Sequence, residues 1–160
     1  MKNIGVIGLG DMGSGIALNL IKNGFKVFGS DLLPARQQAF KNMGGSLEIS
    51  IADIGKKCDA VFVMVMNGSQ AKSIIFDEDG LARNMEAGST VILSATIKPS
   101  EAEEIGHLIK DTGLQFIDTP VSGGFPGAQS GTLTLMASAS EDVMNKNRDV
   151  LEAISANIHH

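Results

Sequence analysis

The residues with the clearest chemical potential lie in a glycine-rich stretch near the N-terminus, which has the spacing G-x-G-x-x-G. Gly8 permits a tight turn, Gly10 lets a diphosphate approach the backbone, and Gly13 allows a following helix to pack closely. The free N–H groups and the positive dipole end of such a helix attract phosphate. The stretch therefore predicts a phosphate-binding turn made of Gly8, Leu9, Gly10, Asp11, Met12 and Gly13.

The sequence on either side gives this turn the surroundings of a nucleotide site. The apolar run Ile4–Ile7 precedes it and is typical of a buried strand, while apolar residues at helical spacing follow it. A second apolar run, residues 26–30, ends at Asp31, 18 residues after Gly13. A carboxylate there accepts hydrogen bonds from ribose hydroxyls and repels a 2′-phosphate, so we expect NAD rather than NADP. Arg36, the nearest cation, is expected to face solvent, and the alternative to a nucleotide site is a glycine-rich turn without a ligand.

Strands and helices alternate along most of the chain. The strands that the apolar runs predict comprise residues 4–7, 26–30, 60–65, 90–93 and 114–117. The predicted helices begin at Pro34, at Ser50 or Asp53, at Gly68 and at Ser100, where Glu103 completes a capping box. This alternation predicts an α/β fold of the Rossmann type, with a doubly wound, mostly parallel sheet and helices on both faces. We expect one NAD-binding domain over residues 1–160 and no second domain within the chain.

The alternation stops at residues 118–131, DTPVSGGFPGAQSG, which contain four glycines and two prolines. They show no helical or strand period, so we expect an irregular loop. Open α/β sheets bind ligands at the carboxyl ends of their strands, and the N–H groups of Gly123 and Gly124 with the Ser122 hydroxyl suit a small carboxylate. The loop is either such a substrate site or a plain connection. A strand and a final helix, capped by Ser140, are expected to follow it.

The composition argues against several classes of partner. A net charge of −5 without any basic run argues against nucleic acid and against an anionic membrane surface. No apolar run reaches the roughly 18 residues of a membrane span. The single cysteine, Cys58, allows no internal disulfide and precedes an apolar strand, so we expect a buried, unreactive thiol in a cytoplasmic protein. We expect no metal site.

Two motifs taken together resemble those of a known family. Residues 8–13 and the stretch DTPVSGG at residues 118–124 look like the motifs of the β-hydroxyacid dehydrogenases, and the similarity extends over essentially the whole chain. That family includes 3-hydroxyisobutyrate dehydrogenase, L-threonate dehydrogenase and tartronate semialdehyde reductase. Thr119 stands where the family more often has alanine. The resemblance implies NAD-dependent hydride transfer between nicotinamide and a small β-hydroxy acid.

The resemblance also implies roles for individual residues. It places further cofactor contacts at Val65, Met66, Gln70 and Thr96. The pair Val65-Met66 replaces the leucine-proline pair that is more usual in the family, which favours the threonate dehydrogenase branch. Ser122, Gly123 and Gly124 match the family's loop for the substrate carboxylate.

A catalytic lysine is expected outside the given residues. In the family it lies on a long helix that follows this domain, so the resemblance implies no catalytic residue within residues 1–160 and a nearly inactive fragment. Lys72 and Lys98 do not match it, because the first lies on a predicted surface helix and the second in a loop before a proline. His107 is expected on an exposed helix face.

Two other functions remain open at this point. One is an NADPH-dependent reductase of a semialdehyde acid, against which Asp31 argues. The other is a nucleotide-sensing module without catalysis, against which the Pro120–Gly124 loop argues, since a sensor needs no site for a substrate. We also expect a homo-oligomer, with the apolar side chains of the final helix as its candidate contact, namely Val143, Met144, Val150 and Leu151.

Overall fold

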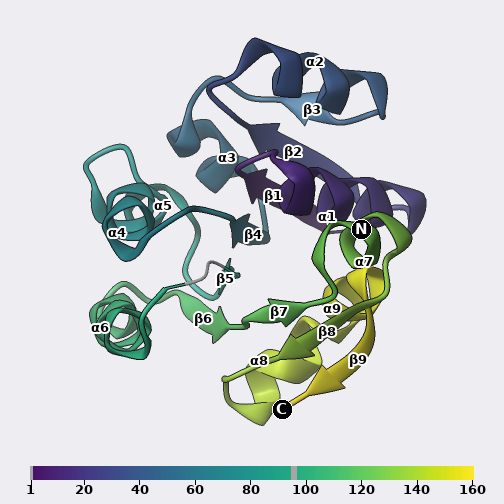
Figure 1. Ribbon diagram of the computed structural model, residues 1–160. Coiled ribbons are helices and arrows are strands. Elements are labelled where there is room, and N and C mark those ends of the chain that lie inside the picture. The colour runs from purple at the N-terminus through teal and green to yellow at the C-terminus, as the bar shows by residue number, and fades with distance from the viewer. Residues whose placement is uncertain (1, 95–96) are drawn as a thin grey trace.

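A parallel sheet carries the fold. The computed structural model describes residues 2–94 and 97–160. Its strands are β1 (Asn3–Ile7), β2 (Lys26–Ser30), β3 (Ser46–Leu47), β4 (Ala60–Val63), β5 (Thr90–Leu93) and β6 (Gln115–Asp118). They lie side by side in the order β3-β2-β1-β4-β5-β6 (Figure 1). The order changes direction between β1 and β4, as in the Rossmann fold, so the predicted fold class is confirmed.

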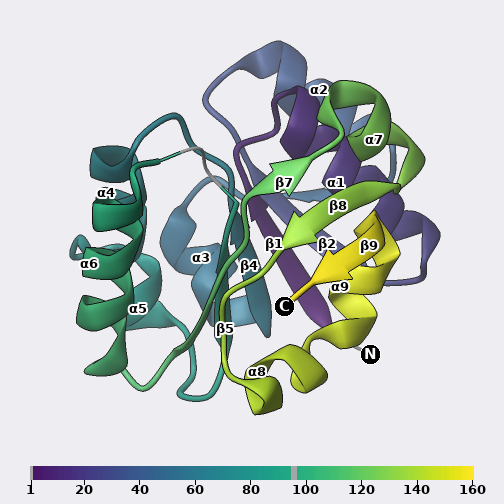
Figure 2. The same ribbon diagram turned by 60° about the horizontal axis from the view of Figure 1, so that its bottom comes forward.

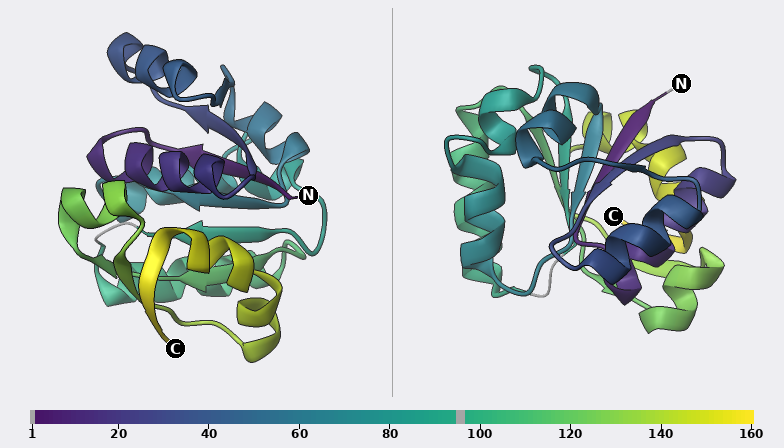
Figure 3. Two further views of the ribbon diagram at one scale, coloured as in Figure 1. Left: turned by 90° about the vertical axis from the view of Figure 1, so that its right-hand side faces the viewer. Right: turned by 90° about the horizontal axis from the view of Figure 1, so that it is seen from above.

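Helices cover both faces of this sheet (Figures 2 and 3). One face carries α1 (Asp11–Lys22), α2 (Pro34–Asn42), α7 (Gly124–Ser130), α8 (Glu141–Lys146) and α9 (Arg148–Ile154). The other carries α3 (Ile51–Lys57), α4 (Gly68–Phe76), α5 (Leu81–Asn84) and α6 (Pro99–Lys110). In β4, Phe62 faces the first layer, whereas Val61 and Val63 face the second. A continuous apolar run therefore forms a strand buried on both sides.

Residues 118–131 are ordered by contacts with distant parts of the chain. β7 (Val121–Ser122) pairs antiparallel with β8 (Leu133–Met136), which pairs parallel with β9 (Ser155–His159). Helix α7 follows β7 and packs against α1. The expectation of an irregular loop is therefore wrong, because glycine-rich residues that lack a helical period on their own are held in a helix by α1.

The start of α6 also differs from the prediction. The helix begins at Pro99, in the first-turn position that proline favours. The side chain of Glu101 accepts a hydrogen bond from the backbone N–H of Lys98, at 3.2 Å. The predicted capping box of Ser100 and Glu103 is therefore wrong, because the helix start and its capping residues, Lys98 and Glu101, lie two residues earlier in the sequence.

The expected final helix is divided into α8 and α9, which meet at Asn147. The predicted cap is confirmed, since the Ser140 hydroxyl accepts a hydrogen bond from the N–H of Val143. The buried Asn147 amide donates to the hydroxyl of Thr90, at 3.1 Å, and to the carbonyl of Val143, at 2.9 Å. These bonds fix the break between the two helices against β5.

The apolar side chains of these two helices pack inward. Three of the four residues expected to mediate self-association are buried in the core: Met144, Val150 and Leu151. Val143 is partly buried against the same cluster. The prediction that this surface joins two copies of the chain is therefore wrong. Separately, none of the helices in residues 2–94 and 97–160 has the length and hydrophobicity needed to cross a bilayer.

Cys58 ends α3 just before β4 and is buried, as predicted. Burial raises the pKa of its thiol to about 12, because the charged thiolate loses its hydration there. We therefore expect Cys58 to resist a colorimetric disulfide reagent in the native protein and to react fully in guanidinium chloride, as followed by absorbance. Stoichiometric labelling of native protein within minutes would contradict this expectation.

Candidate functional site

Two adjoining cavities open at the carboxyl ends of the parallel strands, where the strand order changes direction. The outer cavity, of about 540 Å³, lies beside Asp31 and α4. The inner cavity, of about 560 Å³, lies beside residues 10–13 and Ser94. Residues that line both are Gly8, Arg36, Met64, Val65 and Met66. Open α/β sheets bind ligands in this crevice.

Glycine is required at two corners of the turn between β1 and α1. Gly8 has a φ of +96°, and a Cβ there would lie 2.1 Å from the carbonyl oxygen of Met64. A Cβ on Gly13 would lie 1.8 Å from the carbonyl oxygen of Gly8. At both positions a neighbouring backbone carbonyl lies too close for any side chain, so no other residue type fits unless the backbone moves.

Gly10 differs from the other two motif glycines because its missing side chain leaves open space. It occupies the N-cap of α1 with a φ of −70°, and no side chain caps the first N–H groups of the helix. The three atoms nearest to a Cβ on Gly10 would belong to the guanidinium of Arg36, at 3.6 to 3.7 Å, which is an ordinary contact distance. Uncapped N–H donors beside an open surface suit a diphosphate.

Asp31 is fixed at the carboxyl end of β2. Its Oδ2 accepts a hydrogen bond from the N–H of Leu9, at 2.8 Å, and its Oδ1 accepts one from the N–H of Leu33, at 2.9 Å. Oδ2 also lies 3.5 Å from Nη1 of Arg36. Arg36 is exposed, as predicted, with 47% of its side chain accessible, but the prediction missed its contact with Asp31. Side chains in a first helical turn lean back toward the helix N-terminus, which brings the guanidinium to the end of β2.

The residues after β4 form another part of the lining of the two cavities. Val65 and Met66 line both cavities, and Gln70 lines the outer one. The carbonyl oxygen of the Gln70 side chain accepts a hydrogen bond from the N–H of Met66, at 2.9 Å, which fixes this turn. Asn67 caps α4 by accepting from the N–H of Gln70. Thr96, also predicted to contact the cofactor, lies outside the described residues.

Ser94 supplies a polar group at the floor of the inner cavity. Its hydroxyl is buried and has no hydrogen-bond partner within the described protein. A buried hydroxyl without a partner costs free energy, which a ligand amide or hydroxyl offsets. The uncapped start of α1, the Asp31 carboxylate and the Ser94 hydroxyl thus fit the diphosphate, ribose and polar end group of a dinucleotide.

The predicted substrate residues lie apart from these cavities. Ser122, Gly123 and Gly124 join β7 to α7, and within the described part of the chain none of the three lines the outer or the inner cavity. Gly123 and Gly124 have φ angles of +124° and +57°, which glycine adopts readily. The structure therefore brings the described residues predicted to bind the cofactor together, whereas those predicted to bind the substrate lie outside both cavities, at the start of α7.

Asn19, which the sequence reading did not single out, joins α1 to α7. Its amide nitrogen lies within hydrogen-bond distance of three carbonyl oxygens, those of Gly15, Ala128 and Gln129, at 3.0, 2.7 and 3.0 Å. Carbonyl groups at a helix C-terminus lack partners within the helix, and Asn19 satisfies those of α7. A polar residue on the otherwise apolar face of α1 was the signal in the sequence.

Asp118, the last residue of β6, is half-buried, and burial raises the pKa of its carboxyl above the ordinary 3.8. A raised pKa in the folded state means that ionisation opposes folding as the pH rises through it. We therefore expect Asp118→Asn to be more stable than the parent at pH 7, with the difference narrowing as the pH falls to 4. Urea denaturation at both pH values measures this difference.

Asp79→Asn is the control for that experiment, because Asp79 is an exposed carboxylate in a turn and its replacement should change little. Equal destabilisation of Asp118→Asn at both pH values would show instead that the carboxylate makes a favourable contact.

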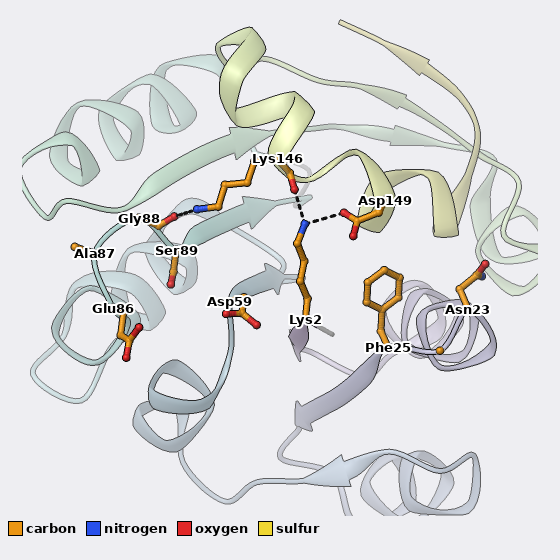
Figure 4. Close-up of a pocket in the computed structure, with 11 residues that line it drawn as sticks. Lys2, Asn23, Phe25, Asp59, Glu86, Ala87, Gly88, Ser89, Lys146 and Asp149 are labelled. Atoms are coloured by element: carbon orange, nitrogen blue, oxygen red, sulfur yellow. Dashed lines mark hydrogen bonds and ion pairs between the residues drawn. The ribbon is translucent and has the colours of Figure 1, made fainter.

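A further crevice, of about 590 Å³, lies at the amino ends of the parallel strands, opposite the two cavities (Figure 4). Lys2 donates to the carboxylate of Asp149, at 2.8 Å, and to the carbonyl of Lys146. Lys146 in turn donates to the carbonyl of Gly88. Because oxygens of the protein already engage both ammonium groups, this crevice serves as a junction between α8, α9 and the sheet.

Comparison with known proteins agrees with this geometry. Residues 3–160 match the family model described as the NAD binding domain of 6-phosphogluconate dehydrogenase. An L-threonate dehydrogenase of Cupriavidus necator is 41% identical over 158 residues, which cover 99% of this chain and 53% of that protein. Mouse mitochondrial 3-hydroxyisobutyrate dehydrogenase is 34% identical over 155 residues, or 97% of this chain and 46% of that protein.

Solved structures give the same result. A 3-hydroxyisobutyrate dehydrogenase from Salmonella typhimurium superposes with a TM-score of 0.94 at 33% identity, covering 100% of this chain and 56% of that one. The Mycobacterium tuberculosis 3-hydroxyisobutyrate dehydrogenase, solved with L-serine, superposes with a TM-score of 0.95 at 29% identity, covering 100% of this chain and 54% of that one. The chain therefore spans about half the length of the relatives it matches.

Proposed function

Because this chain belongs to the family of the NAD-binding domain of 6-phosphogluconate dehydrogenase, we propose that it is the cofactor half of an NAD-dependent dehydrogenase of small β-hydroxy acids. Residues 1–160 would form one cofactor-binding domain. The observation that carries the proposal is the crevice at the β1–β4 reversal, where an uncapped helix start faces a fixed carboxylate. Both groups suit the adenosine diphosphate part of NAD.

Each cavity would hold one part of the cofactor. Asp31 would accept hydrogen bonds from the adenosine ribose in the outer cavity, and Gly10 with the start of α1 would hold the diphosphate. Ser94 would bind the nicotinamide end in the inner cavity. When bound, NAD supplies the hydride acceptor for oxidation of a carbinol carbon. The residues of this chain would then act by position, holding that acceptor still beside the substrate.

The substrate would be a short carboxylic acid that carries a hydroxyl group. Relatives of this chain are named as dehydrogenases of L-threonate, 3-hydroxyisobutyrate and L-serine, which share those two groups. Ser122, Gly123 and Gly124 would hold the carboxylate through a hydroxyl and backbone N–H groups. The lysine that assists proton removal would lie beyond residue 160, so the isolated chain would be nearly inactive.

Isothermal titration of the 160-residue chain with NAD⁺ tests the cofactor half of this proposal. The absence of any heat with folded protein would refute it. A panel of threonate, 3-hydroxyisobutyrate, serine and glycerate, assayed with a polypeptide extended to the length of its relatives, tests the substrate class. Activity on none of these acids would refute the dehydrogenase assignment. The same extended protein would show whether it is a homo-oligomer, which stays a prediction.

One observation favours a second function, that of an NADPH-dependent reductase of a semialdehyde acid. The guanidinium of Arg36 lies beside Asp31 and carries the charge that a 2′-phosphate requires. Asp31 is the stronger determinant, because backbone N–H groups fix both of its oxygens at the end of β2, where the ribose would lie. Titration with NADP⁺ separates the two functions, and binding as tight as that of NAD⁺ would favour the reductase.

A further inference from the structure

Arg36 reaches from α2 to the glycine-rich turn. It is the third residue of that helix, and its side chain is 47% exposed. Its Nη1 lies 3.5 Å from Oδ2 of Asp31. A Cβ on Gly10 would lie 3.6 to 3.7 Å from three atoms of the guanidinium, Cζ, Nη1 and Nη2. The group therefore lies across the uncovered backbone of Gly10 while it contacts the carboxylate.

This placement puts the guanidinium between the two cavities. Arg36 lines the outer cavity with Asp31 and Leu33, and the inner cavity with Gly10 and Met12. A dinucleotide that spans both cavities must pass its diphosphate through this junction. A guanidinium presents N–H donors in one plane and matches two phosphate oxygens at once.

The hydrogen bonds of Asp31 decide what Arg36 does when ribose binds. Oδ1 accepts from the N–H of Leu33, and Oδ2 accepts from the N–H of Leu9 and faces Arg36. A ribose hydroxyl that donates to Oδ2 must take the place that the guanidinium now occupies. The displaced cation then needs another anion, and the surface of Gly10 beneath it is where a diphosphate would lie.

We propose that Arg36 is a cofactor-binding residue that exchanges Asp31 for the diphosphate when a dinucleotide binds. The exchange frees Asp31 for the ribose and places a cation on the phosphates opposite the start of α1. This inference rests on the function proposed above, since it requires a dinucleotide in the crevice. Arg36 would then contribute to the affinity for the phosphates, and Asp31 would contribute to the affinity for the ribose.

The test compares ligands with and without phosphate on variants of the 160-residue chain. In Arg36→Ala, affinity for ADP-ribose and for NAD⁺ should fall about tenfold or more by isothermal titration. Affinity for adenosine, measured by NMR titration, should stay the same or rise, because Asp31 no longer shares its oxygen with a cation. Arg36→Lys should retain part of the phosphate affinity, since it keeps the charge but loses the planar fork.

Lys41→Ala is the matched control, because it removes an exposed cation near the far end of the same helix. Its affinities should equal those of the parent chain. Equal losses for adenosine and ADP-ribose in Arg36→Ala would overturn the proposal and show a structural role, and so would unchanged affinity for both. An effect confined to NADP⁺ would also overturn it, by assigning Arg36 to the 2′-phosphate. If the parent chain binds neither NAD⁺ nor ADP-ribose, the proposed function itself fails.

Discussion

Replacing Gly10 with alanine is expected to leave the protein folded and to weaken NAD⁺ binding about 100-fold, or roughly 2.7 kcal/mol. The φ of −70° at Gly10 suits alanine, and the atoms nearest to the added Cβ would be those of the Arg36 guanidinium, at an ordinary 3.6 Å. That Cβ would, however, occupy the surface on which we place the diphosphate. Isothermal titration measures the loss of affinity, and thermal unfolding shows that the fold is retained.

Gly106→Ala is the control for this variant. Gly106 lies inside α6, and a Cβ there would lie 3.7 Å from the ring of Phe116, again at an ordinary contact distance. It should bind NAD⁺ as the parent chain does. Parent-like affinity in Gly10→Ala would place the diphosphate elsewhere and remove the main support for the proposed site.

The other two motif glycines could not serve for this experiment. A Cβ on Gly8 or Gly13 would lie 2.1 or 1.8 Å from a backbone oxygen, so alanine at either position would disturb β1, α1 or the turn after β4. Loss of binding in those variants would follow from loss of the fold. At Gly10, in contrast, a side chain would take up space that the ligand needs but would not disturb the backbone, so this variant tests binding separately from folding.

The nucleotide-binding half of the fold could be predicted because its determinants are local in the sequence. The apolar run of β4, residues 60–63, and that of β5, residues 90–93, indicate strands buried on both faces without reference to any partner. The turn at residues 8–13 requires glycine for reasons of backbone geometry alone. Helix α4 begins at Gly68, as predicted, and the side chain of Asn67 caps it.

The errors arose where distant contacts decide the local structure. Helix α7 contains three glycine and proline residues in seven, and its stability comes from packing against α1, where the side-chain amide of Asn19 donates hydrogen bonds to carbonyl groups near the end of α7. The break at Asn147 depends on a hydrogen bond to Thr90, on a strand far away in the sequence. The contact of Arg36 with Asp31 was not predicted, because it depends on how α2 leaves β2, which no local pattern in the sequence specifies.

The contact between α1 and α7 leads to the second large effect, a loss of stability in Gly15→Ala of about 2 to 4 kcal/mol. Alanine in a helix interior is favoured over glycine by about 1 kcal/mol, so propensity alone predicts the opposite sign. A Cβ on Gly15, however, would lie 2.6 to 2.9 Å from the carbonyl carbon, Cβ and carbonyl oxygen of Ala128. Because these are mainly backbone atoms, α7 would have to move away from α1.

That movement would also lengthen the hydrogen bonds from Asn19 to Ala128 and Gln129, which are 2.7 and 3.0 Å long. Urea denaturation measures the effect, and Gly106→Ala again provides the comparison, since it makes the same substitution inside a helix with open space. Gly106→Ala should be stabilised by up to about 1 kcal/mol. If Gly15→Ala were equally stable, α7 would not be held closely by α1. The proposed substrate loop at the start of α7 would then not be positioned by the helix that we propose holds the diphosphate.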